Sequence, residues 1–158
     1  KCYPRWWHAA LGKNHFRIRR FDLALVEFKS MNLPDWWWNQ VELAYTDAIA
    51  LGFDIPVRMS GDIKGTPGCM LMGPNGYFEL PDGVIRAQPH AHMHPDDAAY
   101  YGVKHLDTMK LKVHGPLGMT FDNLVVRVDP SFKLEVHIDT DEGNACGLKP
   151  DTFCELTK

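Results

Sequence analysis

The sequence predicts a mostly β protein, a compact barrel or sandwich decorated with short helices. Short β-branched or alternating runs follow one another from Asn39 onward, separated by turns rich in Gly, Pro and Asp. One strand–helix–strand pattern also recurs three times. Many short strands at such spacing are typical of closed or sandwiched sheets. The runs are IPVRM (55–59), CMLMG (69–73), GVIRA (83–87), MKLKVHG (109–115), NLVVRV (123–128), KLEVHI (133–138) and FCEL (153–156).

The bulk composition is that of an ordinary globular chain. Its 158 residues, 45% of them hydrophobic, suffice for one domain or for two small ones that share a core. The net charge of −3 and the isoelectric point near 6.2 lead us to expect neither a nucleic-acid nor a membrane partner. No apolar run is long enough to span a bilayer, and the N-terminus lacks the layout of a signal peptide. We therefore expect a cytoplasmic protein.

Residues 1–38 differ in composition from the rest of the chain. They contain all five tryptophans, and their seven Lys and Arg against three Asp and Glu give a charge of +4, against −7 for the remaining 120 residues. RIRRFDLALVEFK (17–29) is a plausible strand or helix, and the other residues of this region show no clear pattern.

The four cysteines, Cys2, Cys69, Cys146 and Cys154, are scattered without a Cys-x-x-Cys pair. This predicts reduced, small core residues. A thiolate that binds metal or acts as a nucleophile is the alternative.

The repeated unit covers residues 42–53, 92–103 and 137–148. An apolar residue follows the first position, acids lie four and five residues after it in two of the copies, and glycine stands at the tenth position after it in all three. This order indicates a strand end, a helix N-cap with acids at the positive helix terminus, one or two helical turns, and a glycine that ends the helix. The copies thus predict repeated strand–helix–strand units.

The first position of the repeat holds Glu42, His92 and His137. In a pseudo-symmetric barrel, equivalent strand ends converge around the axis, so these side chains are expected to meet, with His90 adding an imidazole on the face of His92. Imidazole nitrogens and a carboxylate form a catalytic type of zinc site, which keeps one coordination position open. The alternative is a purely architectural repeat whose first position is merely polar.

The stretch PHAHMHPDD (89–97) places His90, His92 and His94 at alternate positions. If the stretch is extended, all three rings project from one face of a strand. They form either a metal-binding edge or a solvated polar strand that contains three imidazoles. His94 begins a proline turn, so we expect it outside the ligand set, beside the metal ligands or in solvent.

The loop SGDIKGTPG (60–68) contains three glycines and a proline around Asp62 and Thr66. Free backbone N–H groups in such a tight loop can cradle an anion such as phosphate. Many surface turns share this composition, so the signal is not specific.

A family resemblance rests on several blocks from Asn39 to the C-terminus, about three-quarters of the chain. The blocks are NQVELAYTDAIALG, PVRMSGDIKGTPG, GPNG, GVIRAQPHAHMHPDDA, YGVK, FDNLVVRV and LEVHIDTDEGNACGLK. They resemble the PduL-type phosphate propanoyltransferases, the phosphotransacylases of bacterial microcompartments. The resemblance implies conversion of acyl-CoA, typically propanoyl-CoA, and inorganic phosphate into acyl phosphate and coenzyme A.

The resemblance also implies a two-barrel fold with two zinc ions between the barrels. His90, His92 and His137 would bind one zinc, and Glu42 would contribute to the other. Ser60 would lie beside the metals, Asn144 and His137 near bound coenzyme A, and Ser60 and His137 would be the catalytic residues. A location in the microcompartment lumen, association with its shell and a homo-oligomer follow by analogy.

Two features of the family pattern are missing. We find no His-x-His-Leu block before Glu42, and Trp36 stands where the family places a phosphate-contacting arginine. Residues 1–52 are therefore expected to be a divergent or remnant part of the first barrel, and residues 53–158 a second barrel that carries the histidines, with C-terminal strands available to complete the first. A truncated or frame-shifted N-terminal region is one explanation. A diverged, inactive zinc- or CoA-binding module is another, and a zinc thioester hydrolase is a third reading of the same residues.

Overall fold

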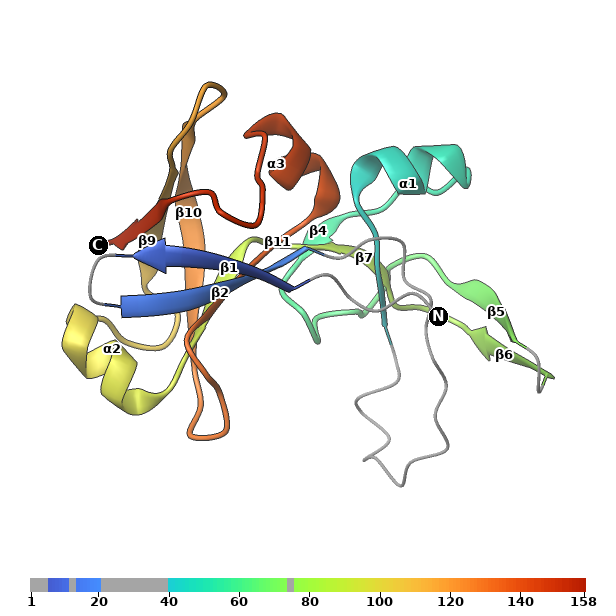
Figure 1. Cartoon of the computed structure of the whole chain (residues 1–158). Coiled ribbons are helices and arrows are strands. Elements are labelled where there is room, and N and C mark those ends of the chain that lie inside the picture. Colours follow the sequence, from blue (N-terminus) through green and yellow to red (C-terminus); the bar gives the residue numbers. More distant parts are fainter. Residues whose placement is uncertain (1–5, 12–13, 21–39, 74–75) are drawn as a thin grey trace. The chain divides into compact units, whose positions relative to one another are not determined.

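A computed structural model describes residues 6–11, 14–20, 40–73 and 76–158 (Figure 1). The chain divides into two compact units. The first, here called the C-terminal unit, combines residues 3–22 with residues 89–158, and the second, the central unit, covers residues 23–88.

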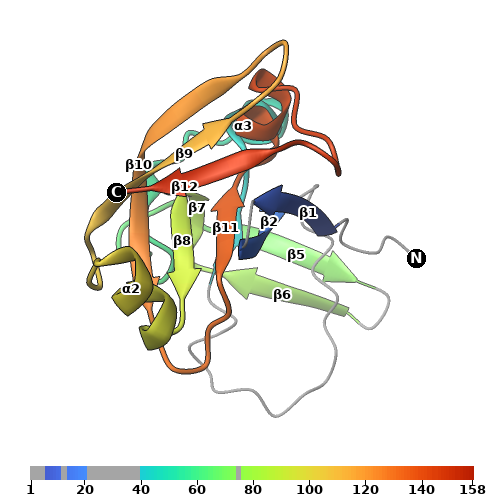
Figure 2. The ribbon, with the colours of Figure 1, turned by 60° about the vertical axis from the view of Figure 1, so that its left-hand side comes forward.

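A seven-stranded sheet forms the C-terminal unit, in the order β1-β2-β11-β8-β10-β9-β12. Strand β8 is parallel to β10 and antiparallel to β11, and Figure 2 shows β8 and β11 as neighbouring arrows of opposite direction. The two end strands, β1 and β12, contact each other, so the sheet curls back on itself. The bounds are β1 Trp6–Leu11, β2 Asn14–Arg20, β8 His90–Met93, β9 Thr108–Val113, β10 Met119–Val128, β11 Glu135–Ile138 and β12 Cys154–Thr157.

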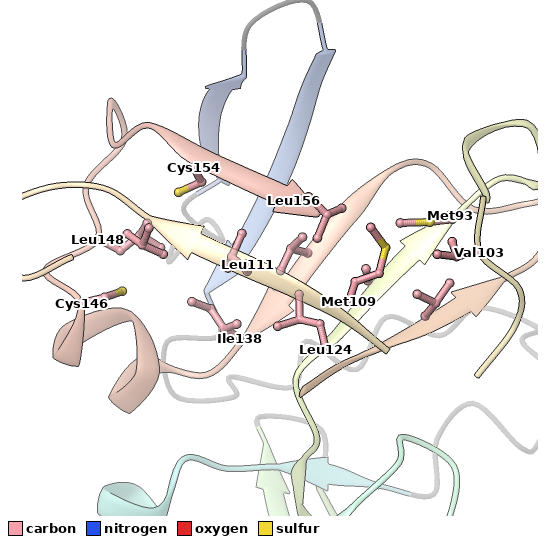
Figure 3. Close-up of a cluster of buried hydrophobic side chains, with 14 of the residues drawn as sticks. Met93, Val103, Met109, Leu111, Leu124, Ile138, Cys146, Leu148, Cys154 and Leu156 are labelled. Atoms are coloured by element: carbon pink, nitrogen blue, oxygen red, sulfur yellow. The ribbon is translucent and has the colours of Figure 1, made fainter. Parts of the chain in front are cut away.

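Alternation along the strands builds the core of this unit. In β9 every second residue is buried, because successive side chains of a strand point to opposite faces. Met109, Leu111 and Leu124 are completely buried and are among the largest side chains of the cluster in Figure 3. Cys146 and Cys154 belong to the same cluster, and both are free thiols. Burial, aided by the nearby Cys146, raises the pKa of Cys154 to about 12, so this thiol stays protonated and unreactive at neutral pH.

The central unit has a smaller core. Strands β3 (Val41–Glu42), β7 (Val84–Ala87) and β4 (Val57–Arg58) form a parallel three-stranded sheet. Strands β5 (Cys69–Gly73) and β6 (Gly76–Leu80) form an antiparallel hairpin. Its core cluster consists of Val41, Leu43, Ala48, Ile55, Leu80 and Val84.

The three helices begin at one register in the repeated segments. Helices α1 (Tyr45–Ala50), α2 (Pro95–Tyr101) and α3 (Thr140–Ala145) each start three residues after the first position of their segment. The N-caps are Ala44, His94 and Asp139. They lie two residues before Thr46, Asp96 and Asp141, so the acids fall in the first helical turn, as the repeat predicted. His94 and Asp139 themselves accept backbone N–H groups of that turn.

All three helices also end in the same way. The glycine at the tenth position after the first has a positive φ in each segment, and the next residue donates its N–H to a carbonyl five residues earlier. These hydrogen bonds are Phe53 to Ala48 at 2.8 Å, Val103 to Ala98 at 3.0 Å and Leu148 to Gly143 at 2.9 Å.

The mostly β class with short helices is confirmed, and each of the seven sequence runs overlaps a strand. The pair of barrels, and the boundary between residues 52 and 53, stay predictions. Cys2, the tryptophans 36–38 and residues 21–29 of the proposed 17–29 element lie outside the described residues. Within the described part, no helix combines the length and apolar character needed to cross a bilayer.

Gly102 gives a direct test of how the repeated segments are closed. Its φ is +65°, and a Cβ at this position would meet nothing within 4 Å, so only backbone conformation opposes a side chain. We expect Gly102→Ala to lower the free energy of unfolding by about 1–2 kcal/mol, the cost of left-handed backbone for an L-residue. Asparagine tolerates this conformation, so Gly102→Asn is the matched control and loses less. Equal urea midpoints for the wild type and both variants would contradict this account.

Candidate metal centre

Pairing of β8 with β11 brings three imidazoles together. His137 lies opposite His90, and Glu135 lies opposite His92. The alternate residues of these strands, including Ala91 and Val136, are fully buried in the hydrophobic core. Since side chains alternate along a strand, the three histidines and Glu135 share the other face of the sheet.

The three rings are close enough to share one ion. One nitrogen from each of His90, His92 and His137 lies within 4.8 Å of the others. The ring centroids are 4.3–4.9 Å apart, and His90 and His137 are buried. Two nitrogens on one tetrahedral zinc are roughly 3.4 Å apart, since each Zn–N bond is about 2.0–2.1 Å. A small inward rotation of the rings therefore suffices, and imidazoles are a donor set that zinc prefers.

Glu135 adds a buried carboxylate to this face. Its Oε2 lies 3.2 Å from Nε2 of His137, and both side chains are about nine-tenths buried. An ionised carboxylate only accepts hydrogen bonds, so it favours the tautomer with the proton on Nε2 and the lone pair on Nδ1. Carboxylates commonly orient metal-binding histidines in this way. Glu135 was not among the predicted site residues, although its place two residues before His137 in a strand was a usable signal.

Phe132 covers one of the imidazoles. Its ring stacks on His92 with centroids 4.0 Å apart and an interplanar angle of 12°. The position comes from a turn in which the Phe132 N–H donates to the Asp129 carbonyl at 3.0 Å. An aromatic wall of this kind limits water at the ring and fixes its orientation. No sequence pattern predicts this contact.

His94, the third histidine of the alternating stretch, caps a helix. Its Nδ1 accepts the N–H of Asp96 at 3.2 Å, while its own N–H donates to the Asp97 carboxylate at 3.1 Å. The side chain is 41% exposed. His94 therefore lies outside the cluster formed by the other three histidines, as the proline turn suggested.

In the central unit, one amide joins the two residues that the sequence singled out there. The Nε2 of Gln40 donates to Oε1 of Glu42 at 2.7 Å and to Oγ of Ser60 at 2.6 Å. Its Oε1 accepts the N–H of Gly61 at 2.7 Å. Gln40 uses both amide protons and its carbonyl, so it holds Glu42 and the start of the 60–68 loop in one arrangement. Gln40, too, was not among the predicted site residues.

The 60–68 loop offers fewer free donors than expected. The N–H groups of Gly61, Asp62 and Thr66 donate to Gln40, Met59 and Ile63 respectively. The Thr66 hydroxyl also accepts the N–H of Gly83 at 2.8 Å. These bonds pin the loop to its own unit, so those three N–H groups do not form the anion cradle that the composition suggested.

The predicted site residues divide between the two units. His90, His92, His137 and Asn144 belong to the C-terminal unit, with Asn144 exposed in α3. Glu42 and Ser60 belong to the central unit. The structure brings the three histidines together, and it links Glu42 to Ser60 through Gln40. The convergence of Glu42 with the histidines stays a prediction.

Fold and site together define a mostly β protein with a histidine cluster able to hold a metal ion. A family model described as phosphate propanoyltransferase matches residues 34–149. The chain belongs to this phosphate propanoyltransferase family.

Curated relatives carry the same description. The chain is 59% identical over 121 residues to a phosphate propanoyltransferase of Planctopirus limnophila, an alignment that covers 76% of this chain and 50% of the relative. It is 49% identical over 120 residues to that of Salmonella arizonae, covering 75% and 57%. For Thermotoga maritima the identity is 52% over 111 residues, covering 70% and 53%. The chain thus spans about half the length of the curated relatives it matches.

Zinc titration tests the histidine cluster directly. We expect His92→Ala to remove a ligand and weaken zinc binding by at least about 100-fold, and Glu135→Gln to weaken it by about 10–100-fold through loss of ring orientation. His114→Ala is the matched control, because His114 pairs with Glu155 outside the cluster. Competition against a coloured chelator measures all four proteins. Unchanged affinity in His92→Ala would remove the cluster as a metal site.

The Gln40 network predicts a pH-dependent stability difference. In Gln40→Glu, a second carboxylate replaces the donor beside Glu42, and like charges raise the carboxyl pKa of the pair in the folded state. A raised folded pKa makes the variant relatively more stable at low pH, and this contribution is lost as pH rises through that pKa. The deficit against the wild type should therefore be largest near pH 7 and shrink toward pH 4 in urea unfolding. A deficit independent of pH would contradict the contact.

Proposed function

We propose that this chain carries out phosphotransacylation: acyl-CoA and inorganic phosphate give acyl phosphate and coenzyme A, with propanoyl-CoA as the acyl donor. A phosphate oxygen forms a bond to the thioester carbonyl carbon, the carbon–sulfur bond breaks, and the thiolate of coenzyme A leaves with its electron pair. The observation that carries the proposal is the cluster of His90, His92 and His137, two of them buried, in a member of the phosphate propanoyltransferase family.

The proposed cofactor is zinc, as two ions. His90, His92 and His137 would hold one of them, and Glu42 would contribute to the other. When bound, zinc supplies positive charge that offsets the charge of phosphate, polarises the thioester carbonyl and favours the thiolate. The imidazole cluster supports the first of these sites by its donor chemistry and its burial. Glu135 would keep the His137 ring oriented, and Phe132 would limit water beside His92.

Ser60 is proposed as a positioning group for phosphate and not as a nucleophile. Its Oγ lies 2.6 Å from the Nε2 of Gln40, and an amide donor cannot take the hydroxyl proton. A serine needs an adjacent base to become nucleophilic. This arrangement favours direct transfer to phosphate over an acyl-enzyme. Asn144 and His137 are proposed to lie near bound coenzyme A.

The family also motivates a cellular setting. We infer that the protein works as a homo-oligomer in the lumen of a bacterial microcompartment, in association with its shell. This part of the proposal rests on analogy with the family alone.

A catalytically silent zinc- or CoA-binding module is the second candidate. Trp36 stands at the place of the family's phosphate-contacting arginine. One tightly held zinc with no turnover would favour this module. Two zinc ions with turnover would favour the enzyme.

Turnover assays decide between these functions. Propanoyl-CoA and phosphate should give free thiol, read with a thiol reagent, and acyl phosphate, trapped with hydroxylamine. Chelation should abolish the reaction and zinc should restore it, while His137→Ala should lower kcat at least about 100-fold, the scale for losing a group that stabilises developing charge. His114→Ala should match the wild type. Thiol release without phosphate would instead identify a thioester hydrolase, and turnover without metal would contradict the zinc role.

A further inference from the structure

The side chain of Arg127, in β10, lies beside the histidine cluster. We propose that its guanidinium binds the inorganic phosphate substrate at this cluster, and this inference rests on the function proposed above. It assigns a substrate contact to a residue that the sequence did not single out.

Strand register places Arg127 on the face that carries the cluster. In the parallel pair of β8 and β10, Arg127 is the partner of His92, and Val125 is the partner of His90. Leu124 and Val126 are fully buried in the core on the opposite face. Because side chains alternate, Arg127 projects to the same side as His92 from the adjacent strand.

The ring of Phe132 contacts both the Arg127 guanidinium and His92 of the histidine cluster. The guanidinium carbon of Arg127 is 6.0 Å from the centroid of the Phe132 ring, at the outer limit of a cation–π contact. The same ring stacks on His92 at 4.0 Å. A weak contact of this kind orients the guanidinium while leaving its N–H groups for a ligand.

No carboxylate neutralises Arg127 within the part of the chain that the structure describes. Its guanidinium takes part in no salt bridge or hydrogen bond there, and the side chain is half-buried. Arg58 in the central unit differs, since its Nε lies 3.8 Å from the Asp62 carboxylate. In a chain of net charge −3, an uncompensated arginine beside buried imidazoles is a local attraction for an anion.

The position favours inorganic phosphate over the phosphate groups of coenzyme A. Phosphate must reach the thioester carbon, and so it must bind at the reacting centre. The phosphates of coenzyme A are separated from its sulfur by the long pantetheine arm, so a cation next to the ligand cluster is poorly placed for them. The planar guanidinium fork also matches two phosphate oxygens at once.

Steady-state kinetics with both substrates varied test the assignment. Arg127→Gln should raise KM for phosphate about 10–100-fold, the loss expected for hydrogen bonds to a charged group, and leave KM for propanoyl-CoA nearly unchanged. Arg127→Lys keeps the charge without the fork, so it should recover part of the phosphate affinity. Lys110→Gln, which removes an exposed charge from β9, is the matched control and should behave as the wild type. Circular dichroism and urea midpoints check that the variants fold.

A binding measurement separates this proposal from the proposed function. Calorimetry of the zinc-loaded full chain with inorganic phosphate, without acyl-CoA, needs no turnover. Weaker phosphate binding in Arg127→Gln supports the assignment even if the wild type is inactive, and phosphate binding equal to that of the wild type overturns it. A KM effect confined to propanoyl-CoA also overturns it, because the cation would then serve coenzyme A.

Discussion

The antiparallel pairing of β8 with β11 is the constraint on which the candidate site depends. Each strand has four residues, and alternate residues point to opposite faces of the sheet. One face packs into the hydrophobic core, and the other carries the three imidazoles and Glu135. Both strands are kept in register because their core-facing side chains are buried, and a shift by one residue would expose them. These side chains are Ala91, Met93, Val136 and Ile138. The stability of the core is therefore what fixes the distances among the histidines.

On the sheet face that carries the histidines, neighbouring side chains restrict the orientation of the imidazole rings. Glu135 holds the ring of His137, Phe132 holds the ring of His92, and Arg127 brings a positive charge to the same face. In the central unit, Gln40 does similar work for Glu42 and Ser60. Four of the predicted site residues thus each have a partner that restricts their position, as a preorganised site requires. They are Glu42, Ser60, His92 and His137.

Much of the fold could be read from the sequence, whereas most supporting contacts could not. The run MKLKVHG predicted β9, and the repeat predicted three short helices. The acids lie in the first turn of each helix, as predicted, whereas the use of His94 and Asp139 as N-caps is a side-chain effect that acid positions alone do not show. Gln40, Phe132 and Arg127 depend on which strands are neighbours, and that information is absent from local patterning. Glu135 was the exception, since period-two spacing from His137 pointed to it.

The three repeated segments share one backbone frame and yet present different side chains at their first position. Each begins its helix at the same offset and closes with the same hydrogen bond around a left-handed glycine, whether that position holds Glu42, His92 or His137. The backbone conformation of the segment therefore does not depend on whether its first residue offers an oxygen or a nitrogen to a metal. Protein engineers could exchange oxygen for nitrogen donors at these places, and so alter which ion is preferred, without redesigning the scaffold.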